Sequence, residues 1–380
     1  SPGTSQDGLT AVCGGATSVT QDDCDDGDNT IFPGNTGGFC SGADSDCDPN
    51  DVDEWVYNAT TDAVYLGTDP ATQLQAALLA ASDNDVLEVC STSIFSGAFE
   101  VNHSITISGV DGLGASMQAP FQQSPSASSV ITIDASGPVT LDHISVSGDI
   151  TSVAGRGGCI DLEAGDLALN DVNLDACYAA EGGAIYTADA TTLSWDGGQC
   201  TNSTATSNRG GCLSSEGSFT SLTDVDLLGN IATTVGGGFY LGGTAGTLDW
   251  YSGLCGANGA SNGGCFYADL GSQLVLGDGA GEDLEIQGDF SYPVINSNVG
   301  ATSANQGVIL GSVVALSDTT VIQSLGAATY DIVIEGGDFC WVGATVPGAV
   351  TIKPIAGPLA DQGSLGNVYC TPTTCSTSCP

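Results

Sequence analysis

The chain has 380 residues, enough for a large core in one or two domains. Only three residues are basic against 45 acidic ones, and the formal net charge of -42 excludes nucleic acid as a natural partner, because almost nothing can neutralise phosphates. An anionic membrane would be repelled for the same reason, and no apolar stretch has the roughly 18 residues that a membrane span needs.

The acidity has two interpretations, a halophilic source and bound calcium, and they are compatible with each other. Fifteen scattered cysteines indicate an oxidising, extracellular or cell-surface location, and the odd number leaves at least one thiol free or bonded to another molecule. With only two histidines, a Cys/His zinc site is not expected. The first residue is Ser1 and not Met, which is typical of a chain whose signal peptide has been removed.

The N-terminal segment, residues 1–57, contains the densest acidic stretch. Calcium prefers six to eight hard oxygen ligands, and closely spaced carboxylates are unstable unless a cation lies among them. The segment therefore predicts a small calcium-binding module, the alternative being a solvated acidic face. The candidate Ca²⁺ ligands are Asp23, Asp26, Asp28, Asp44, Asp46, Asp48, Asp53 and Glu54.

This segment, "DDCDDGDNTIFPGNTGGFCSGADSDCDPNDVDE", resembles the Asp/Cys-rich metal-binding repeats of bacterial surface proteins, and its calcium loops are similar to those of thrombospondin type 3 repeats. Ser41 and Pro49 depart from the pattern, and neither change removes an oxygen ligand from the candidate set. The resemblance implies calcium binding and disulfides within one group of cysteines: Cys13, Cys24, Cys40 and Cys47.

A short helix is expected near residues 72–81, where Leu74, Ala77, Leu78 and Ala81 fall on one face. Strands "VLEVC", "AFEV" and "SITISG" follow it. An open end of a stacked sheet would recruit other chains, so this helix is predicted to cap the domain that spans residues 58–355.

Five segments of that domain repeat Gly-Gly, a small residue and a short apolar run, at steps of 25, 28, 26 and 27 residues. Alternation after the glycines predicts strands, and a second strand-like run follows about ten residues later. The period suits one turn of a parallel β-helix. A leucine-rich repeat would need a helical segment, and a propeller blade would need a longer period. The segments are GGCIDL, GGAIYT, GGCLSS, GGGFYL and GGCFYA.

The opening "PATQLQAALLAASDNDVLEVC" resembles right-handed β-helix proteins of the pectin lyase-like superfamily, and the Gly-Gly units resemble the repeats of polymorphic outer-membrane proteins and related bacterial surface β-helices. The resemblance implies an all-β, right-handed parallel β-helix with an N-terminal capping helix. It implies little about activity, because this fold hosts lyases, hydrolases, adhesins and structural fibres.

Three cysteines of the repeats, Cys159, Cys212 and Cys265, stand 53 residues apart, which is two turns and too far for a disulfide between them. Shorter spacings suggest two clips, Cys200–Cys212 and Cys255–Cys265, the alternative being small buried residues in a stack. The tail, residues 356–380, is rich in Cys, Pro and Thr. Candidates for a free or intermolecular thiol are Cys340, Cys370, Cys375 and Cys379.

No catalytic constellation stands out in the sequence. Arg156 and Arg209 each precede a Gly-Gly pair, nothing in the sequence places acids opposite them, and they are expected to be structural, as are His103 and His143. Paired acids within the coils are expected to be exposed turn and strand residues: Asp171, Asp175, Asp224 and Asp226. The chain has three Asn-X-Ser/Thr triplets, at Asn58, Asn102 and Asn202. Such triplets are common enough to arise by chance.

These patterns predict a secreted structural protein and not an enzyme: a self-assembling filament or surface-layer subunit, stabilised by Ca²⁺ and disulfides, with other copies of the chain as its partner. The first alternative is a cell-surface adhesin or glycan-binding β-helix. The second is a polysaccharide lyase or hydrolase, which should bring Asp, His and Arg together in one groove.

Overall fold

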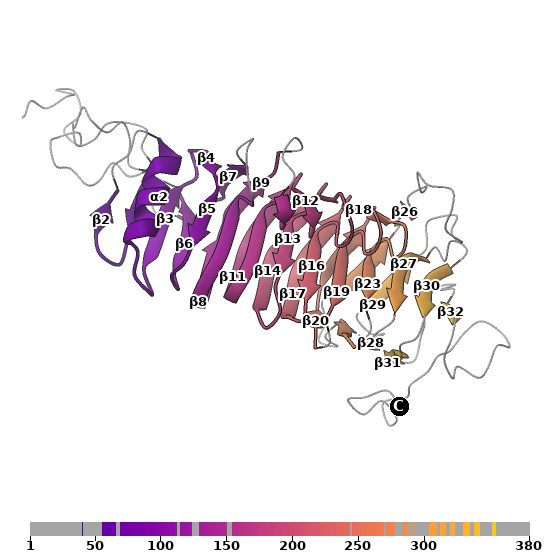
Figure 1. The fold of residues 1–380 in the computed structure, drawn as a ribbon. Coiled ribbons are helices and arrows are strands. Elements are labelled where there is room, and N and C mark those ends of the chain that lie inside the picture. Colours follow the sequence, from indigo (N-terminus) through magenta and orange to yellow (C-terminus); the bar gives the residue numbers. More distant parts are fainter. Residues whose placement is uncertain are drawn as a thin grey trace, which may run out of the picture.

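The computed structural model describes residues 40, 55–65, 69–111, 115–123, 129–149, 154–243, 245–269 and 271–277, and the backbone of strands between residues 284 and 354. The described chain is almost entirely β-structure and winds into a parallel solenoid of about six turns (Figure 1). No helix in this part of the chain has the length and apolar character needed to cross a membrane.

Strands of successive turns pair in parallel register and form four faces. Long strands bend at a corner and contribute to more than one face. One face is called the diglycine face because Gly-Gly pairs precede five of its strands, β11, β13, β16, β19 and β23. It contains β5 (Phe99–Val101), the start of β8 (Ile131–Asp142), the start of β11 (Ile160–Asp175), β13 (Ile185–Thr187), β16 (Leu213–Glu216), β19 (Phe239–Gly242), β23 (Phe266–Ala268), β27 (Ala304–Ile309), β30 (Tyr330–Ile334) and β32 (Ile352–Pro354). The middle face contains β3 (Val86–Cys90), β6 (Thr106–Val110), the end of β8, the middle of β11, the starts of β14 (Thr192–Thr201) and β17 (Phe219–Leu228), β20 (Thr247–Trp250), β24 (Gln273–Leu276), β28 (Ser312–Leu316) and β31 (Asp338–Val342).

The remaining two faces complete each turn. The third face contains β4 (Phe95–Gly97), β7 (Ala119–Gln123), β9 (Ile144–Ser147), the ends of β11, β14 and β17, β21 (Gly253–Gly256), β25 (Leu284–Gln287) and β29 (Thr320–Gln323). The short-strand face contains β10 (Ala154–Arg156), β12 (Tyr178–Glu181), β15 (Thr204–Ala205), β18 (Ile231–Ala232), β22 (Gly259–Ala260) and β26 (Phe290–Ser291).

The two glycines that open each repeat are required for different steric reasons. The first has a positive φ, from +43° at Gly157 to +68° at Gly263, in a region that L side chains rarely adopt. The second contacts the next turn: a Cβ on Gly183 would overlap the carbonyl oxygen of Gly211 and lie 2.7 Å from the backbone nitrogen of Thr204. Because neither position carries a side chain, the backbones of successive turns can approach to the spacing of paired strands.

The N-terminal turn is bordered by two antiparallel strands and the helix. β1 (Val56–Asn58) pairs antiparallel with β3, and β2 (Ala63–Val64) pairs antiparallel with β1. Helix α2 covers Pro70–Ala80, close to the expected range, with Asp69 as N-cap accepting the Thr72 amide at 2.9 Å. Its buried residues Leu74, Ala77 and Leu78 belong to the main core, and α2 contacts β1, β4 and β5.

The interior is filled by columns of apolar side chains that point inward from equivalent positions of successive turns. On the diglycine face, Ile160, Ile185 and Leu213 pair in register, and the column continues with Phe239 and Phe266, whose rings stack at 5.7 Å. All five side chains are fully buried. The columns therefore make each turn depend on its neighbours for burial, as in other solenoids.

Four disulfides lie among the described residues, and two of them, Cys200–Cys212 and Cys255–Cys265, are the clips that the spacing suggested. The third joins Cys159 to Cys177 and had not been foreseen. The fourth joins Cys40 to Cys90, 50 residues away. The implied pairing of Cys40 within the N-terminal segment is therefore wrong, because its sulfur ties that segment to the start of the solenoid. Cys13, Cys24 and Cys47 lie outside the described residues.

Candidate functional site

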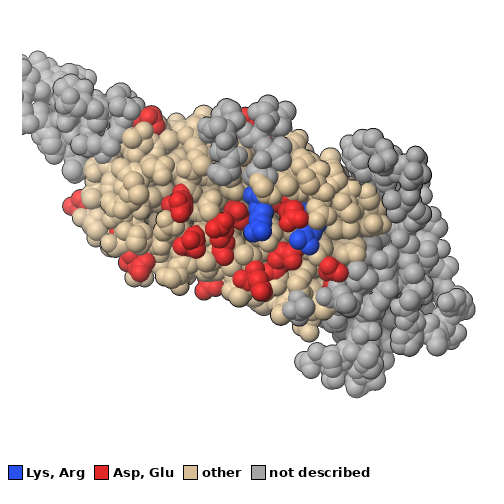
Figure 2. Space-filling view, viewed as in Figure 1, with Lys and Arg blue, Asp and Glu red and all other residues tan. Residues whose placement is uncertain are grey.

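The outer side of the diglycine face carries a cluster of charged and tyrosine side chains. Figure 2 shows the two described arginines on this face, surrounded by acidic residues. We call the following residues the charged cluster: Arg156, Asp161, Glu163, Glu181, Tyr186, Arg209, Glu216, Tyr240 and Asp269.

The parallel register explains how these residues meet. Asp161 pairs with Tyr186 of the next turn, and the same outward position is then occupied by Ser214, Tyr240 and Tyr267. Equivalent residues of successive turns lie about 4.8 Å apart in a sheet. Side chains separated by one turn of sequence therefore become direct neighbours along the solenoid axis.

Arg209 is the centre of an ion-pair network. Its Nη2 lies 2.6 Å from Glu216 Oε1 and 3.5 Å from Glu181 Oε2, and its guanidinium lies 4.5 Å from the ring centroid of Tyr240. Arg209 Nη1 donates to the Tyr240 hydroxyl at 3.0 Å, and that hydroxyl donates to Asp269 Oδ2 at 2.7 Å. One guanidinium thus binds two carboxylates directly and a third through a tyrosine.

Burial strengthens this network electrostatically. The side chains of Arg209, Glu181 and Glu216 are only 25%, 26% and 20% exposed. Burial raises the pKa of Glu216, and the positive charge of Arg209 opposes that shift. Burial also raises the pKa of the Tyr240 hydroxyl, which its hydrogen bond to Asp269 raises further. The guanidinium of Arg209 therefore offsets only part of the cost of burying the Glu216 carboxylate.

Arg156 repeats the arrangement 53 residues earlier, with its guanidinium 4.7 Å from the ring centroid of Tyr186. Unlike Arg209 it is exposed, and within the described residues its guanidinium has no ion pair or side-chain hydrogen bond. Glu163 occupies the position of Glu216 but is exposed. The two arginines therefore differ: Arg209 is paired with two carboxylates of its own chain, and Arg156 faces solvent.

Asp161 lies beside Arg156 and is the least satisfied acid of the cluster. It is only 9% exposed, and its Oδ1 has no hydrogen-bond partner within the described part of the chain. The pKa of Asp161 is raised to about 6, mainly by burial and also by the charge of Glu163, while the charge of Arg156 opposes both. Near neutral pH, Asp161 is thus a buried carboxylate with incomplete compensation.

Asp161→Asn is expected to stabilise the protein above about pH 6 and to have little effect near pH 3. The folded-state pKa lies above the unfolded value of 3.8, so between these two values the native state holds a proton that the unfolded chain has lost, and stability falls as pH rises from 3.8 to about 6. The gain at pH 8 should be about 1–2 kcal/mol in urea unfolding. An equal difference between the two proteins at pH 3 and pH 8 would show that Asp161 does not carry this charge.

The sequence did contain a signal for this cluster. The stretches RGGCIDLE and RGGCLSSE, from Arg156 and Arg209, place an acid seven residues after each arginine, with the same 53-residue spacing as the cysteines. The expectation that no acids lie opposite the arginines is wrong for Arg209. The sequence does not indicate Glu181 as a partner of Arg209, because Glu181 lies in the preceding turn. Its approach to the guanidinium depends on the register of the paired strands.

The two histidines lie away from the charged cluster. His143 has a φ of +53° at the corner between β8 and β9, with Nδ1 at 2.8 Å from Asp142 Oδ1 and Nε2 at 3.4 Å from Asp171 Oδ2. His103 lies 3.6 Å from Asp83 Oδ1 near α2. Asp171, like Asp175 and Asp224, is exposed, and Asp226 is partly buried. The structure thus brings arginine and acids together without either histidine.

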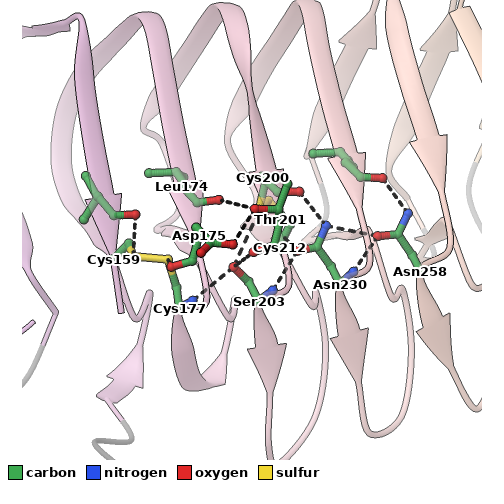
Figure 3. The surroundings of a disulfide bond; sticks show 12 residues. Cys159, Leu174, Asp175, Cys177, Cys200, Thr201, Ser203, Cys212, Asn230 and Asn258 are labelled. Carbon is green, nitrogen blue, oxygen red and sulfur yellow. Dashed lines mark hydrogen bonds between the residues drawn. A yellow bond between two sulfur atoms is a disulfide. The ribbon is translucent and has the colours of Figure 1, made fainter. Parts of the chain in front are cut away.

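A second polar cluster lies inside the solenoid, at the corner between the third and short-strand faces (Figure 3). Cys177, Ser203, Asn230 and Asn258 occupy equivalent positions of successive turns and are buried. Asn230 Oδ1 accepts the Ser203 amide at 3.0 Å, and Asn230 Nδ2 donates to Cys200 O at 2.9 Å and to Asn258 Oδ1 at 3.0 Å. We call this column the polar ladder. It binds the corner backbone of each turn to the next.

The candidate calcium ligands, residues 23–54, lie outside the described residues. Within the described part, no group of three or more His, Cys, Asp or Glu side chains has the geometry to hold a metal ion. The predicted calcium module therefore stays a prediction.

The comparisons with known proteins found no relative of this chain. The chain matches no protein family, no curated protein and no solved structure. The inference of function therefore depends on the chemistry of the charged cluster alone.

Proposed function

We propose that this protein is a secreted structural subunit that assembles with copies of itself, and that Arg156 is a contact in that assembly. The observation that carries the proposal is the difference between Arg156 and Arg209. Both guanidiniums stack on a tyrosine, but Arg209 binds two carboxylates whereas Arg156 is exposed beside the unpartnered Asp161. Arg209 shows which group this arrangement accepts, namely a carboxylate.

A second copy is the occupant that the charge balance favours. The chain has 45 acidic residues and only three basic ones, so a neighbouring copy offers many carboxylates and few competing cations. Net repulsion between the copies is long-ranged and falls with added salt, whereas a close, partly desolvated guanidinium–carboxylate pair is screened less. Arg156 therefore supplies a specific attraction on a surface that is otherwise repulsive.

We further propose that the solenoid winds right-handed, that α2 caps its N-terminal end, and that residues 1–57 form a calcium-binding module. The four disulfides are compatible with an extracellular location. Calcium bound by the N-terminal acids would lower the net charge and so favour assembly. A chelator is then expected to weaken the polymers.

Arg156→Gln is expected to raise the protein concentration needed for assembly by roughly 10- to 100-fold, the equivalent of one charged hydrogen-bonded pair. Sedimentation velocity at fixed salt and calcium measures this shift. The matched control is Glu163→Gln, which removes the exposed acid seven residues later, on β11, and should leave assembly intact or strengthen it.

The outcomes separate the parts of the proposal. If wild type and Arg156→Gln assemble equally, the contact at Arg156 is wrong although the structural role stands. If wild type stays monomeric with calcium at all salt concentrations, self-assembly itself is wrong.

The second candidate is a glycan-binding surface protein, which the same exposed guanidinium favours because Arg also binds carboxylated or hydroxyl-rich sugars. In that case the wild type stays monomeric, and an acidic oligosaccharide binds to it but not to Arg156→Gln.

A further inference from the structure

We propose that Asn102 is a glycosylation site, modified at its side-chain amide by an N-linked glycan. Asn102, His103 and Ser104 form an Asn-X-Ser triplet, one of three Asn-X-Ser/Thr triplets in the chain. The triplet alone is weak evidence, but the structure places the three asparagines in very different surroundings. This proposal does not depend on the proposed self-assembly.

Asn58 cannot carry a glycan in this fold. It is 1% exposed, and its Nδ2 donates to Asp85 Oδ2 at 2.9 Å. Its Oδ1 accepts the backbone amides of Thr60 and Thr61 at 3.0 and 3.1 Å. A sugar on Nδ2 would have to occupy the core of the first turn.

Asn202 is exposed but is tied to its neighbours. It stands at a corner with a φ of +53°, and its Nδ2 donates to Asp175 Oδ1 at 3.0 Å. The next residue, Ser203, is fully buried in the polar ladder. The triplet at Asn202 is therefore held in the stacked backbone, and Asn202 serves as the internal comparison.

Asn102 lies free of these constraints, in the connection between β5 and β6. Its side chain is exposed, and the hydrogen bond from Nδ2, to Glu100 Oε1, is long at 3.3 Å and itself exposed. A glycosylated amide keeps one N–H, so even this bond can persist. The folded protein thus presents the Asn102 amide to solvent with nothing to displace.

A hollow beside Asn102 fits the first sugar. It lies between α2 and the β5–β6 connection and is lined by Gln75, Leu78, Leu79, Glu100, Asn102 and His103. Leu79 is 80% exposed, the most exposed large apolar side chain described. A pyranose has apolar C–H faces and a polar rim, so it would cover Leu79 while its hydroxyls meet Gln75, Glu100 and His103.

The reaction is a group transfer from a lipid-linked diphosphate sugar donor. The bond between sugar C1 and the phosphate oxygen breaks, a bond from C1 to Asn102 Nδ2 forms, Nδ2 loses one proton, and the lipid diphosphate leaves. The donor belongs to the secretory membrane, and export is already implied by the cysteine content.

Mass spectrometry of the protein purified from its natural source tests the proposal. Trypsin is unsuitable because the chain has three basic residues, but cleavage after acidic residues releases Val101–Asp111, in which Asn102 is the only asparagine. This peptide is expected to carry hexose or hexosamine mass, and release by an amidase should convert Asn102 to aspartate. The peptide containing Asn58 should be unmodified.

Variants produced in the same source show whether the glycan is attached to Asn102. Asn102→Gln should abolish the added mass, and so should Ser104→Ala, whereas Asn202→Gln should leave the Val101–Asp111 peptide modified. Circular dichroism confirms that Asn102→Gln folds. Finding Val101–Asp111 wholly at its unmodified mass in the natural protein overturns the proposal, as does added mass that persists in Asn102→Gln.

Discussion

Gly183→Ala is expected to destabilise the protein by more than about 3 kcal/mol or to prevent folding. The added Cβ would overlap the carbonyl oxygen of Gly211 in the next turn and lie 2.6–2.7 Å from the backbone of Thr204. Thr204 belongs to the paired strand β15, and the Gly211 amide donates to Gly236 O at 3.0 Å, so neither backbone can move aside as a flexible side chain can. Urea unfolding followed by circular dichroism measures the loss.

The matched control is Gly155→Ala in the neighbouring short strand, where an added Cβ has no atom within 4 Å. Its stability should equal that of the wild type within about 0.5 kcal/mol. If both substitutions are tolerated, the turns are not packed glycine against glycine, and the explanation of the repeat is wrong.

Asn230→Leu is the second substitution with a large expected effect, a loss of about 3 kcal/mol or more. Leucine fills a similar volume but removes the acceptor for the Ser203 amide and the donor to Cys200 O and Asn258 Oδ1. Each buried polar group left without a partner costs about 1–3 kcal/mol. The loss should appear as a lower midpoint of urea unfolding.

Asn170→Leu is the comparison for Asn230→Leu, because Asn170 is exposed on β11 and its side chain does not point into the interior. The same chemical change there should alter stability by about 0.5 kcal/mol or less. Equal effects at both positions would mean that the polar ladder does not hold the turns together.

The solenoid could be predicted because its cause is local and periodic. Five successive turns each carry a first glycine with positive φ, as at Gly182, and a second glycine, as at Gly183, where a Cβ would overlap the next turn, so the pattern recurs with the period of the turns. The clip Cys255–Cys265 recurs at nearly the spacing of Cys200–Cys212 and was visible for the same reason.

Contacts that occur once could not be predicted. Cys177 stands in a column whose other members are Ser203, Asn230 and Asn258, so no repeat indicates its bond to Cys159. Cys40–Cys90 joins two segments that share no pattern.

The charged cluster could be predicted only in part: the sequence repeats an acid seven residues after each arginine but does not indicate the contact with Glu181. Arg209, Glu181 and Glu216 come from adjacent turns, and their approach depends on the register, since a shift by one residue would turn these side chains inward. Charge patterns along a single strand do not contain that information.

Electron cryomicroscopy of the wild-type protein with calcium tests the proposed function most directly. The account predicts polymers in which the Arg156 guanidinium lies within ion-pair distance of an Asp or Glu carboxylate of the adjacent copy. Isolated single molecules, or polymers in which Arg156 faces only solvent, would contradict it.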